Sequence, residues 1–193
     1  LLFKVGFKST FIEVIYKVLQ TPLQGMSDSF GGAIAIALLI SLFWWCGIHG
    51  ATIIGGIMGP LLQSNGLANQ ELFNQGVQLV AGENAAIVTN QFVDQYITFG
   101  GSGLTLGLVC TMLYFAKSKQ YKQLGRLSIV PGLFNINEPI IFGFPIVFNP
   151  IMAIPFILAP VLSAIMVYVS ISTGLVEPFR AISVPWTTPF IIS

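Results

Sequence analysis

Charged residues are scarce in this sequence, and their absence excludes an ordinary soluble domain. Only 8% of the 193 residues are charged, whereas soluble domains carry about 25%. No Asp, Glu, Lys or Arg occurs in 29–70 or in 139–176, and 96–116 is a third uncharged stretch. Each stretch reaches the roughly 20 apolar residues that cross a bilayer as a helix. The sequence therefore predicts a protein that passes through the membrane several times.

Cysteine, histidine and familiar nucleotide-binding motifs are also rare. Cys46 and Cys110 both lie in apolar segments, which excludes a disulfide framework and gives no metal-ligand spacing. There is no phosphate-binding loop of the GxxxxGK type and no HExxH motif. The net charge of +1 gives no indication of nucleic acid binding. We therefore expect no metal, no cofactor and no nucleic acid partner.

Apolar and polar stretches alternate along the chain. We expect an amphipathic helix at 7–20, a membrane helix at 30–48, a glycine-rich segment at 49–62, polar surface loops and short helices at 63–95, a third membrane segment at 96–116 and a kinked span at 151–173. The glycine-rich segment also contains Pro60, which favours a re-entrant or closely packed segment over a lipid-facing helix. These elements predict an all-α polytopic membrane protein with short amphipathic helices.

Basic residues gather in one short segment, which indicates the topology. Lys117, Lys119, Lys122 and Arg126 have no acidic residue among them. Short basic loops of membrane proteins lie on the cytoplasmic side. We therefore expect the loop 117–126 to face the cytoplasm.

Residues 127–150 combine an apolar composition with features that break a helix. The segment holds four prolines and the polar residues Asn135, Asn137, Glu138 and Asn149. Such a segment suits a re-entrant hairpin or an unwound helix that lines a cavity. Residues 177–189 look like the first arm of a second broken segment.

Glu138 and His49 are the strongest candidates for a functional site. A carboxylate at membrane depth costs about 2.5–3.5 kcal/mol, so Glu138 needs a partner, a proton or a polar ligand, or else it only holds a loop in place. Pro139 blocks an ordinary helix there, which would free backbone groups to face a ligand. His49 is the only histidine and lies between Gly47 and Gly50. Its ring could exchange hydrogen bonds with a hydroxyl, although a structural role is the alternative.

Aromatic residues accompany these polar groups. They are Trp44, Trp45, Phe134, Phe142 and Trp186. A sugar site needs flat apolar rings and a few polar groups, whereas an aromatic in a membrane segment is otherwise part of the core or of the interfacial belt. We expect one or two of them to contact a ligand.

The segment 131–139, PGLFNINEP, resembles the signature of the IIC component of the phosphoenolpyruvate-dependent sugar phosphotransferase system, in its lactose, cellobiose and chitobiose branch. The segments 47–50, 100–104 and 184–189 are similar as well. The resemblance implies a transport domain at 29–193, truncated at its C-terminal end. A linker helix within 1–28 would precede it, and the N-terminal interfacial domain that mediates homodimerisation would be missing. Two re-entrant hairpins would hold the sugar.

The resemblance also implies a function in the bacterial cytoplasmic membrane. A β-linked disaccharide of the cellobiose, diacetylchitobiose or lactose type would be bound and translocated, and its 6-hydroxyl would be phosphorylated by a IIB partner that carries a phosphocysteine. Glu138 would be the hydroxyl acceptor or base, and His49 would orient the sugar. The further candidates for sugar binding are Asn135, Asn137, Gly101, Ser102, Trp45, Trp186 and Thr187.

Other functions stay open from the residues alone. An ion-coupled secondary transporter also uses broken helices and an acid at the bilayer midplane. An intramembrane enzyme in which Glu138 and His49 act without a partner is a second alternative, and a receptor without transport is a third. Whether the chain is itself an enzyme stays open too, because it carries no complete chemistry for phosphoryl transfer.

Overall fold

The computed structural model describes residues 27–182 and 184–189, and the regular elements in this part of the chain are helices. The elements are α3 (Phe30–Trp45), α4 (Gly50–Asn74), α5 (Asn90–Phe92), the π-helix η1 (Val93–Ile97), α6 (Leu106–Tyr114), α7 (Lys119–Leu133), α8 (Glu138–Gly143) and α9 (Pro150–Ser172). A single bridge between Ala81 and Ala85 is the only β-type pairing in the described ranges. The amphipathic helix expected at 7–20 lies outside the described residues.

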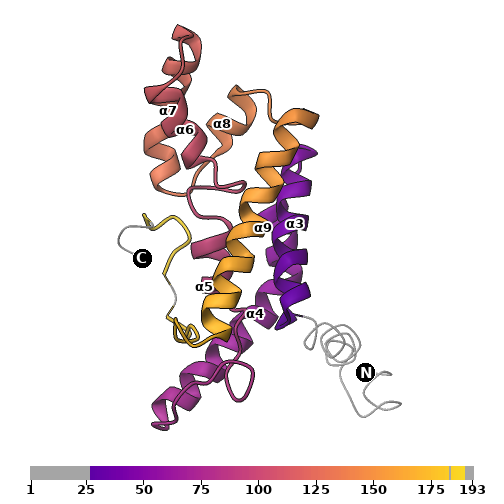
Figure 1. Cartoon of the computed structure of the whole chain (residues 1–193), viewed down its shortest axis with the longest axis vertical. Helices are drawn as coiled ribbons and strands as arrows, with labels where there is room; N and C mark the ends of the chain where they lie inside the picture. Colours follow the sequence, from indigo (N-terminus) through magenta and orange to yellow (C-terminus); the bar gives the residue numbers. More distant parts are fainter. Residues whose placement is uncertain (1–26, 183, 190–193) are drawn as a thin grey trace, which may run out of the picture.

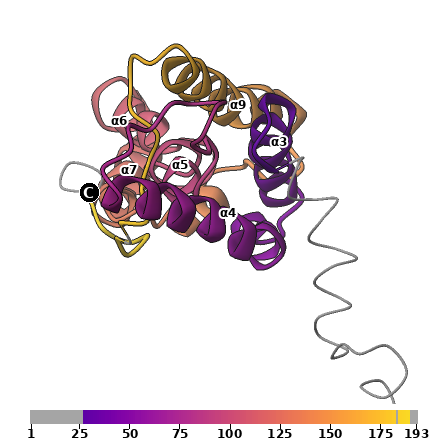
Figure 2. The ribbon, with the colours of Figure 1, turned by 90° about the horizontal axis from the view of Figure 1, so that it is seen from below.

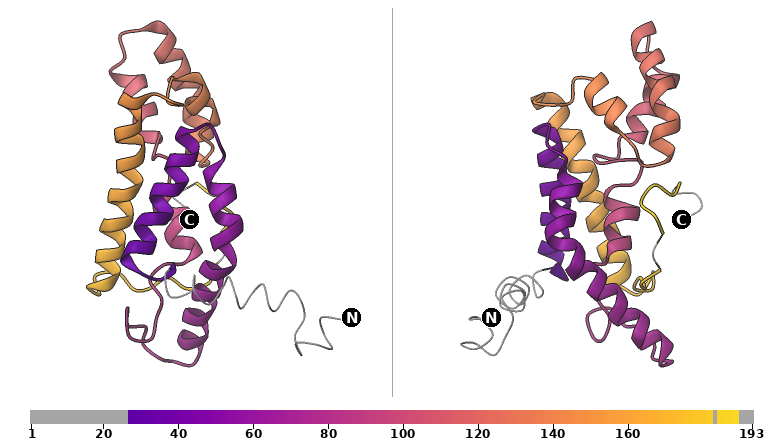
Figure 3. Two further views of the ribbon diagram at one scale, coloured as in Figure 1. Left: turned by 90° about the vertical axis from the view of Figure 1, so that its right-hand side faces the viewer. Right: turned by 180° about the vertical axis from the view of Figure 1, so that it is seen from behind.

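The helices α3 and α9 pack against each other along the length of the molecule (Figure 1). They run antiparallel, because Phe30 at the start of α3 meets Tyr168 near the end of α9 in an edge-to-face contact with ring centroids 5.3 Å apart. Seen along the long axis, α5 lies between α4 and α9 (Figure 2). The hairpin of α6 and α7 stands at one end, together with α8, and the end of α4 lies at the other (Figure 3).

Two helices have the composition of membrane segments. In the described part of the chain, α9 is the one helix that is both long and apolar enough to cross a bilayer, and α3 is a shorter apolar helix. The expected helices at 30–48 and 151–173 are therefore confirmed, with α3 ending at Trp45. Large apolar side chains along α9 point outward, as a lipid-facing surface requires: Ile151, Ile154, Leu158, Leu162, Met166 and Val169.

Residues 49–62, expected to form a re-entrant or closely packed segment and not a lipid-facing helix, belong to one long helix. Helix α4 runs without interruption from Gly50 to Asn74, through Pro60. Gly50 is needed at the corner between α3 and α4, since a Cβ there would lie 2.2 Å from the carbonyl oxygen of Ile40. Gly55 and Gly59 serve a different purpose: nothing lies within 4 Å of their missing Cβ positions, and both border a cavity.

The assignment of 63–95 to polar surface loops and short surface helices is wrong at both of its ends. Residues up to Asn74 continue α4, and 90–97 form α5 and η1 inside the molecule. Phe92 and Ile97 are completely buried. These two apolar residues anchor the segment in the core, and the average polarity of the region hides them.

A half-buried carboxylate and a buried amide hold the stretch that leads into α5. Asp28 accepts hydrogen bonds of 2.7 Å from the backbone N–H groups of Ile87 and Val88. Asn65 on α4 donates to the Val88 carbonyl at 2.9 Å. Backbone groups without a regular partner are thereby satisfied, and the position of η1 is fixed relative to α3 and α4.

The expectation that 96–116 crosses the membrane as one uninterrupted segment is also wrong. Its helix, α6, has nine residues, because the preceding stretch turns through positive φ angles at Gly100, Gly101, Gly103 and Leu104. Such angles end a right-handed helix. The basic loop 117–126 is likewise mostly helical, since α7 begins at Lys119; the side of the membrane on which it lies stays a prediction.

The break expected within 127–150 is confirmed. Helix α7 ends at Leu133, Asn135 has a φ of 62°, and the short helix α8 begins at Glu138. Pro139, however, does not block a helix: it lies in the first turn of α8, where its missing N–H needs no partner. In 177–189, the described residues contain turns and no helix.

Candidate functional site

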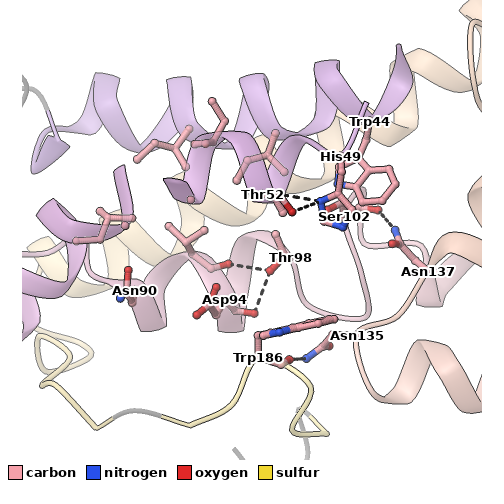
Figure 4. A pocket seen from close by; sticks show the side chains of 18 of the residues that line it. Trp44, His49, Thr52, Asn90, Asp94, Thr98, Ser102, Asn135, Asn137 and Trp186 are labelled. Carbon is pink, nitrogen blue, oxygen red and sulfur yellow. Dashed lines mark hydrogen bonds between the residues drawn. The ribbon is translucent and has the colours of Figure 1, made fainter. Parts of the chain in front are cut away.

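A cavity of about 330 Å³ lies between α3, α4, η1 and the turns around α8 (Figure 4). Its apolar wall comes mainly from α3 and α4, with Ile36, Ile40 and Trp44 spaced one helical turn apart. Its polar residues are His49, Thr52, Asn90, Asp94, Thr98, Ser102, Asn135, Asn137 and Glu138. An apolar cavity with a few convergent polar groups is the general form of a small-ligand site.

His49 and Glu138 face each other across this cavity. The Nε2 atom of His49 lies 3.7 Å from Oε1 of Glu138, and both side chains are more than 40% exposed. The other ring nitrogen of His49, Nδ1, accepts the backbone N–H of Thr52 at 3.2 Å and so caps α4. A neutral ring that accepts at Nδ1 carries its proton on Nε2. The geometry therefore directs an N–H donor toward a carboxylate.

Trp44 supports the imidazole from one side. The two ring centroids are 4.2 Å apart at an angle of 49°. Trp44 is 3% exposed, and its indole N–H is one of two buried side-chain polar groups in the described ranges that have no hydrogen-bond partner. This residue lines the cavity, so an unused donor lies in the cavity wall next to His49.

Asn137 fixes the turn before Glu138 against the glycine-rich loop. It is almost completely buried and donates from Nδ2 to the carbonyl oxygen of Ser102 at 2.6 Å. A Cβ at Gly101 would lie 2.3 Å from Cβ of Asn137, and Gly101 has a φ of 92°. Only glycine fits at this close approach.

Asn135 joins three segments that are far apart in the sequence. Its Oδ1 accepts the N–H of Gly100 at 2.8 Å, and its Nδ2 donates to the carbonyl oxygens of Trp186 and Thr188 at 2.6 and 3.2 Å. The carboxamide is thus occupied by backbone groups. This arrangement holds Trp186 at the cavity (Figure 4).

Six of the nine residues predicted from the sequence line the cavity: His49, Glu138, Asn135, Asn137, Ser102 and Trp186. Three do not. Gly101 packs against Asn137, and Thr187 follows Trp186 without bordering the cavity. Trp45 points elsewhere, since its indole N–H donates to the carbonyl of Asn149 at 2.9 Å. That any of these residues binds sugar stays a prediction.

Sequence reasoning missed the polar wall formed by α5 and η1. Asn90, Asp94 and Thr98 border the cavity. Asn90 and Asp94 belong to 63–95, which was expected to form surface loops and short helices, whereas Thr98 belongs to 96–116, which was expected to enter the membrane. Among the described residues, Asp94 has no side-chain hydrogen bond or ion pair. The sequence offered one signal for this wall: the apolar residues Phe92 and Val93 stand among polar neighbours, as in a helix with one buried side.

The cavity has no donor set for a metal ion. Within 27–182 and 184–189, no group of three His, Cys, Asp or Glu side chains is arranged to hold one. Cys46 and Cys110 are unpaired thiols. The chemistry that this site can support is hydrogen bonding and proton transfer between His49, Glu138 and a polar ligand.

Helices of membrane composition around a cavity with facing ionisable groups define the helical ligand-binding domain of a membrane protein. The sequence profile of the family described as "Phosphotransferase system, EIIC" matches residues 2–160. The chain therefore belongs to the EIIC family of the phosphotransferase system. Proteins of this family are integral transporters of the cytoplasmic membrane.

Known relatives agree with this assignment. The chain is 51% identical over 180 residues to the "Putative permease IIC component YwbA" of Bacillus subtilis (strain 168), which covers 93% of this chain and 39% of the relative. It is 47% identical over 184 residues to the "PTS system cellobiose-specific EIIC component" of Geobacillus stearothermophilus, with coverages of 95% and 40%.

A solved structure confirms the fold. It is the transporter ChbC, the IIC component of the N,N'-diacetylchitobiose-specific phosphotransferase system, with a TM-score of 0.84 and 45% identity. The match covers 97% of this chain and 42% of that chain. The sequence therefore spans about two fifths of the length of these relatives.

Proposed function

We propose that this chain is the sugar-binding part of a permease that takes up a β-linked disaccharide and presents its 6-hydroxyl for phosphorylation. The observation that carries the proposal is the pair formed by His49 and Glu138 at the cavity. The names of the cellobiose and diacetylchitobiose relatives support the class of sugar.

The spacing of the pair suits a hydroxyl group. Nε2 and Oε1 are 3.7 Å apart, so one oxygen atom fits at about 2.8 Å from both, which is an ordinary hydrogen-bond distance. His49 would donate its Nε2 proton to this oxygen, and the hydroxyl would donate its own proton to Glu138. Both hydrogen bonds fix the direction of the oxygen lone pair that reacts.

Phosphoryl transfer would follow from this arrangement. The hydroxyl oxygen attacks the phosphorus atom on the cysteine of a IIB partner, an O–P bond forms, and the S–P bond breaks with release of a cysteine thiolate. Glu138 takes the hydroxyl proton as general base. The partner supplies the phosphoryl group, so this chain contributes binding and orientation.

The same proposal includes the setting of the protein. We place it in the bacterial cytoplasmic membrane with 117–126 on the cytoplasmic side, where a IIB protein approaches. Homodimerisation through an interfacial domain N-terminal to this segment is part of the proposal as well.

Asp94 is the observation that favours a second candidate, an ion-coupled sugar transporter. A carboxylate in the cavity without a partner among the described residues could carry a proton or bind a cation. The product of transport separates the two candidates. Vesicles that contain the intact protein, IIB and its phosphoryl donors should accumulate sugar phosphate, whereas accumulation of unmodified sugar along a proton gradient would refute the proposal.

A further inference from the structure

Helix α7 lies at one end of the molecule (Figures 1 and 3). Its inward side consists of Gly125, Ser128 and Gly132, which are buried at spacings of three and four residues. A Cβ at Gly125 would lie 3.1 Å from Met112 of α6. Because this small-residue side packs directly on α6, the opposite side of α7 faces away from the molecule.

Cations occupy the first half of the outward side. Lys119, Lys122 and Arg126 are exposed and follow one another at spacings of three and four residues, so they share one side of the helix. The one ion pair in the described part of the chain joins His49 and Glu138, and these three cations therefore have no carboxylate partner there.

Apolar side chains occupy the second half of the outward side. Leu127 and Val130 are 71% and 60% exposed, and Phe134 continues the row. With a rise of about 1.5 Å per residue, this row runs for about 12 Å beyond Arg126. At the end of α6, Tyr114 and Phe115 are 78% and 79% exposed, and aromatic residues are common at a membrane–water interface.

We propose that the outward surface of α7 binds the head groups of anionic phospholipids. We define the basic–apolar face as Lys119, Lys122, Arg126, Leu127 and Val130. Along the helix this face changes from cationic to apolar. A bilayer changes in the same order, from charged head groups to hydrocarbon. The cations contact the lipid phosphates, and the two apolar residues contact the acyl chains. An acidic protein partner would account for the cations but not for the apolar row.

The expected strength follows from the charge. A basic side chain near an anionic membrane surface strengthens binding roughly fivefold, and three together strengthen it up to roughly 100-fold. Since the attraction is electrostatic, high salt weakens it. The proposal concerns lipid and not sugar, so it stands or fails independently of the proposed function.

The test compares two triple variants of the intact protein. In the first, Lys119→Gln, Lys122→Gln and Arg126→Gln remove the charge. In the second, Lys119→Arg, Lys122→Arg and Arg126→Lys keep it. Native mass spectrometry of the detergent-solubilised protein, titrated with phosphatidylglycerol or phosphatidylcholine, measures how many molecules of each lipid stay bound.

The glutamine variant should lose its preference for phosphatidylglycerol by between fivefold and roughly 100-fold, and the charge-retaining variant should stay near the parent. Sugar binding should persist in both, which shows that they are folded. Unchanged phosphatidylglycerol binding in the glutamine variant would overturn the proposal. Loss of affinity for an acidic IIB partner with lipid binding intact would assign the surface to protein docking, and it would overturn the proposal as well.

Discussion

Replacing one glycine of α4 should close the cavity without harming the fold. Gly55 and Gly56 are neighbours on the same helix, and nothing lies within 4 Å of either missing Cβ. Gly55 lines the cavity and Gly56 does not. The variant Gly55→Leu and its control Gly56→Leu therefore differ only in the direction in which the new side chain points.

The magnitude follows from the size of the cavity. Ligand pockets measure about 300–1,000 Å³, and this cavity, at about 330 Å³, is near the lower limit. A leucine side chain inside it leaves a volume below that range. Overpacking of a filled site costs about 1–3 kcal/mol, which is roughly a five- to 150-fold loss of affinity.

The two leucine substitutions should leave the thermal stability unchanged or raise it, although Gly55→Leu weakens binding. Glycine in a helix interior is about 0.8–1.0 kcal/mol less favourable than alanine, and leucine is among the good helix formers. Both variants should therefore unfold at the same or a higher temperature than the parent. A loss of sugar binding in Gly55→Leu would then have no explanation through misfolding.

The assay is isothermal titration of the purified intact protein with cellobiose and diacetylchitobiose, alongside thermal unfolding. We expect weaker binding for Gly55→Leu and parental binding for Gly56→Leu. Equal binding by both variants would show that the sugar lies elsewhere. Equal losses would show that this stretch of α4 tolerates no side chain, and the cavity argument would be refuted.

Four further predictions concern the site and its supports. Glu138→Gln should lower sugar phosphorylation by about 10²–10⁴-fold while binding changes less; a normal rate with IIB would make Glu138 structural. His49→Ala should weaken binding about five- to 150-fold, but not for the deoxy-sugar that lacks the oriented hydroxyl; equal losses for every analogue would indicate a structural histidine. Asn135→Ala should lower the unfolding temperature and the affinity together, whereas Asn135→Gly, which relieves the positive φ, should restore part of the stability but not the affinity; full recovery by glycine would show that the amide bonds do not matter. Cysteines at Ser118 and Gln123 should resist an impermeant thiol reagent added outside intact cells, and rapid labelling would invert the topology.

The polar pair of the site could be found from the sequence because membrane segments make such residues conspicuous. Glu138 and His49 stand out from apolar surroundings, and the cost of burying them points to a function. Asp94 carries the same information, but it lies in a region that is rich in polar residues. An average over that region hides one carboxylate that faces inward.

The choice between Trp44 and Trp45 shows a second limit. Successive residues on a helix point about 100° apart, so only one of the two can face the cavity. The sequence of α3 is apolar on every side and gives no stripe that marks the inward face. The structure decides for Trp44, which continues the row of Ile36 and Ile40.

Asn135 illustrates a structural role that local sequence does not reveal. Its position in the broken segment predicted a sugar contact. In the structure, its carboxamide bonds to the backbone of Gly100, Trp186 and Thr188. Hydrogen-bond partners that are 35 and 51 residues away cannot be deduced from local sequence.

The attachment of Trp186 through Asn135 has a consequence for biosynthesis. His49 and Trp186 both line the cavity, and they lie 137 positions apart in the sequence. At about 5–20 residues per second, the ribosome needs roughly 7–27 s to make that stretch. During this time the chain contains His49 but not yet Trp186, so the cavity is incomplete. If α3 and α4 enter the membrane before the rest of the chain is made, His49 and the cavity side of α4 face lipid or other helices. They stay so until Trp186 has been made and its carbonyl accepts the hydrogen bond of Asn135.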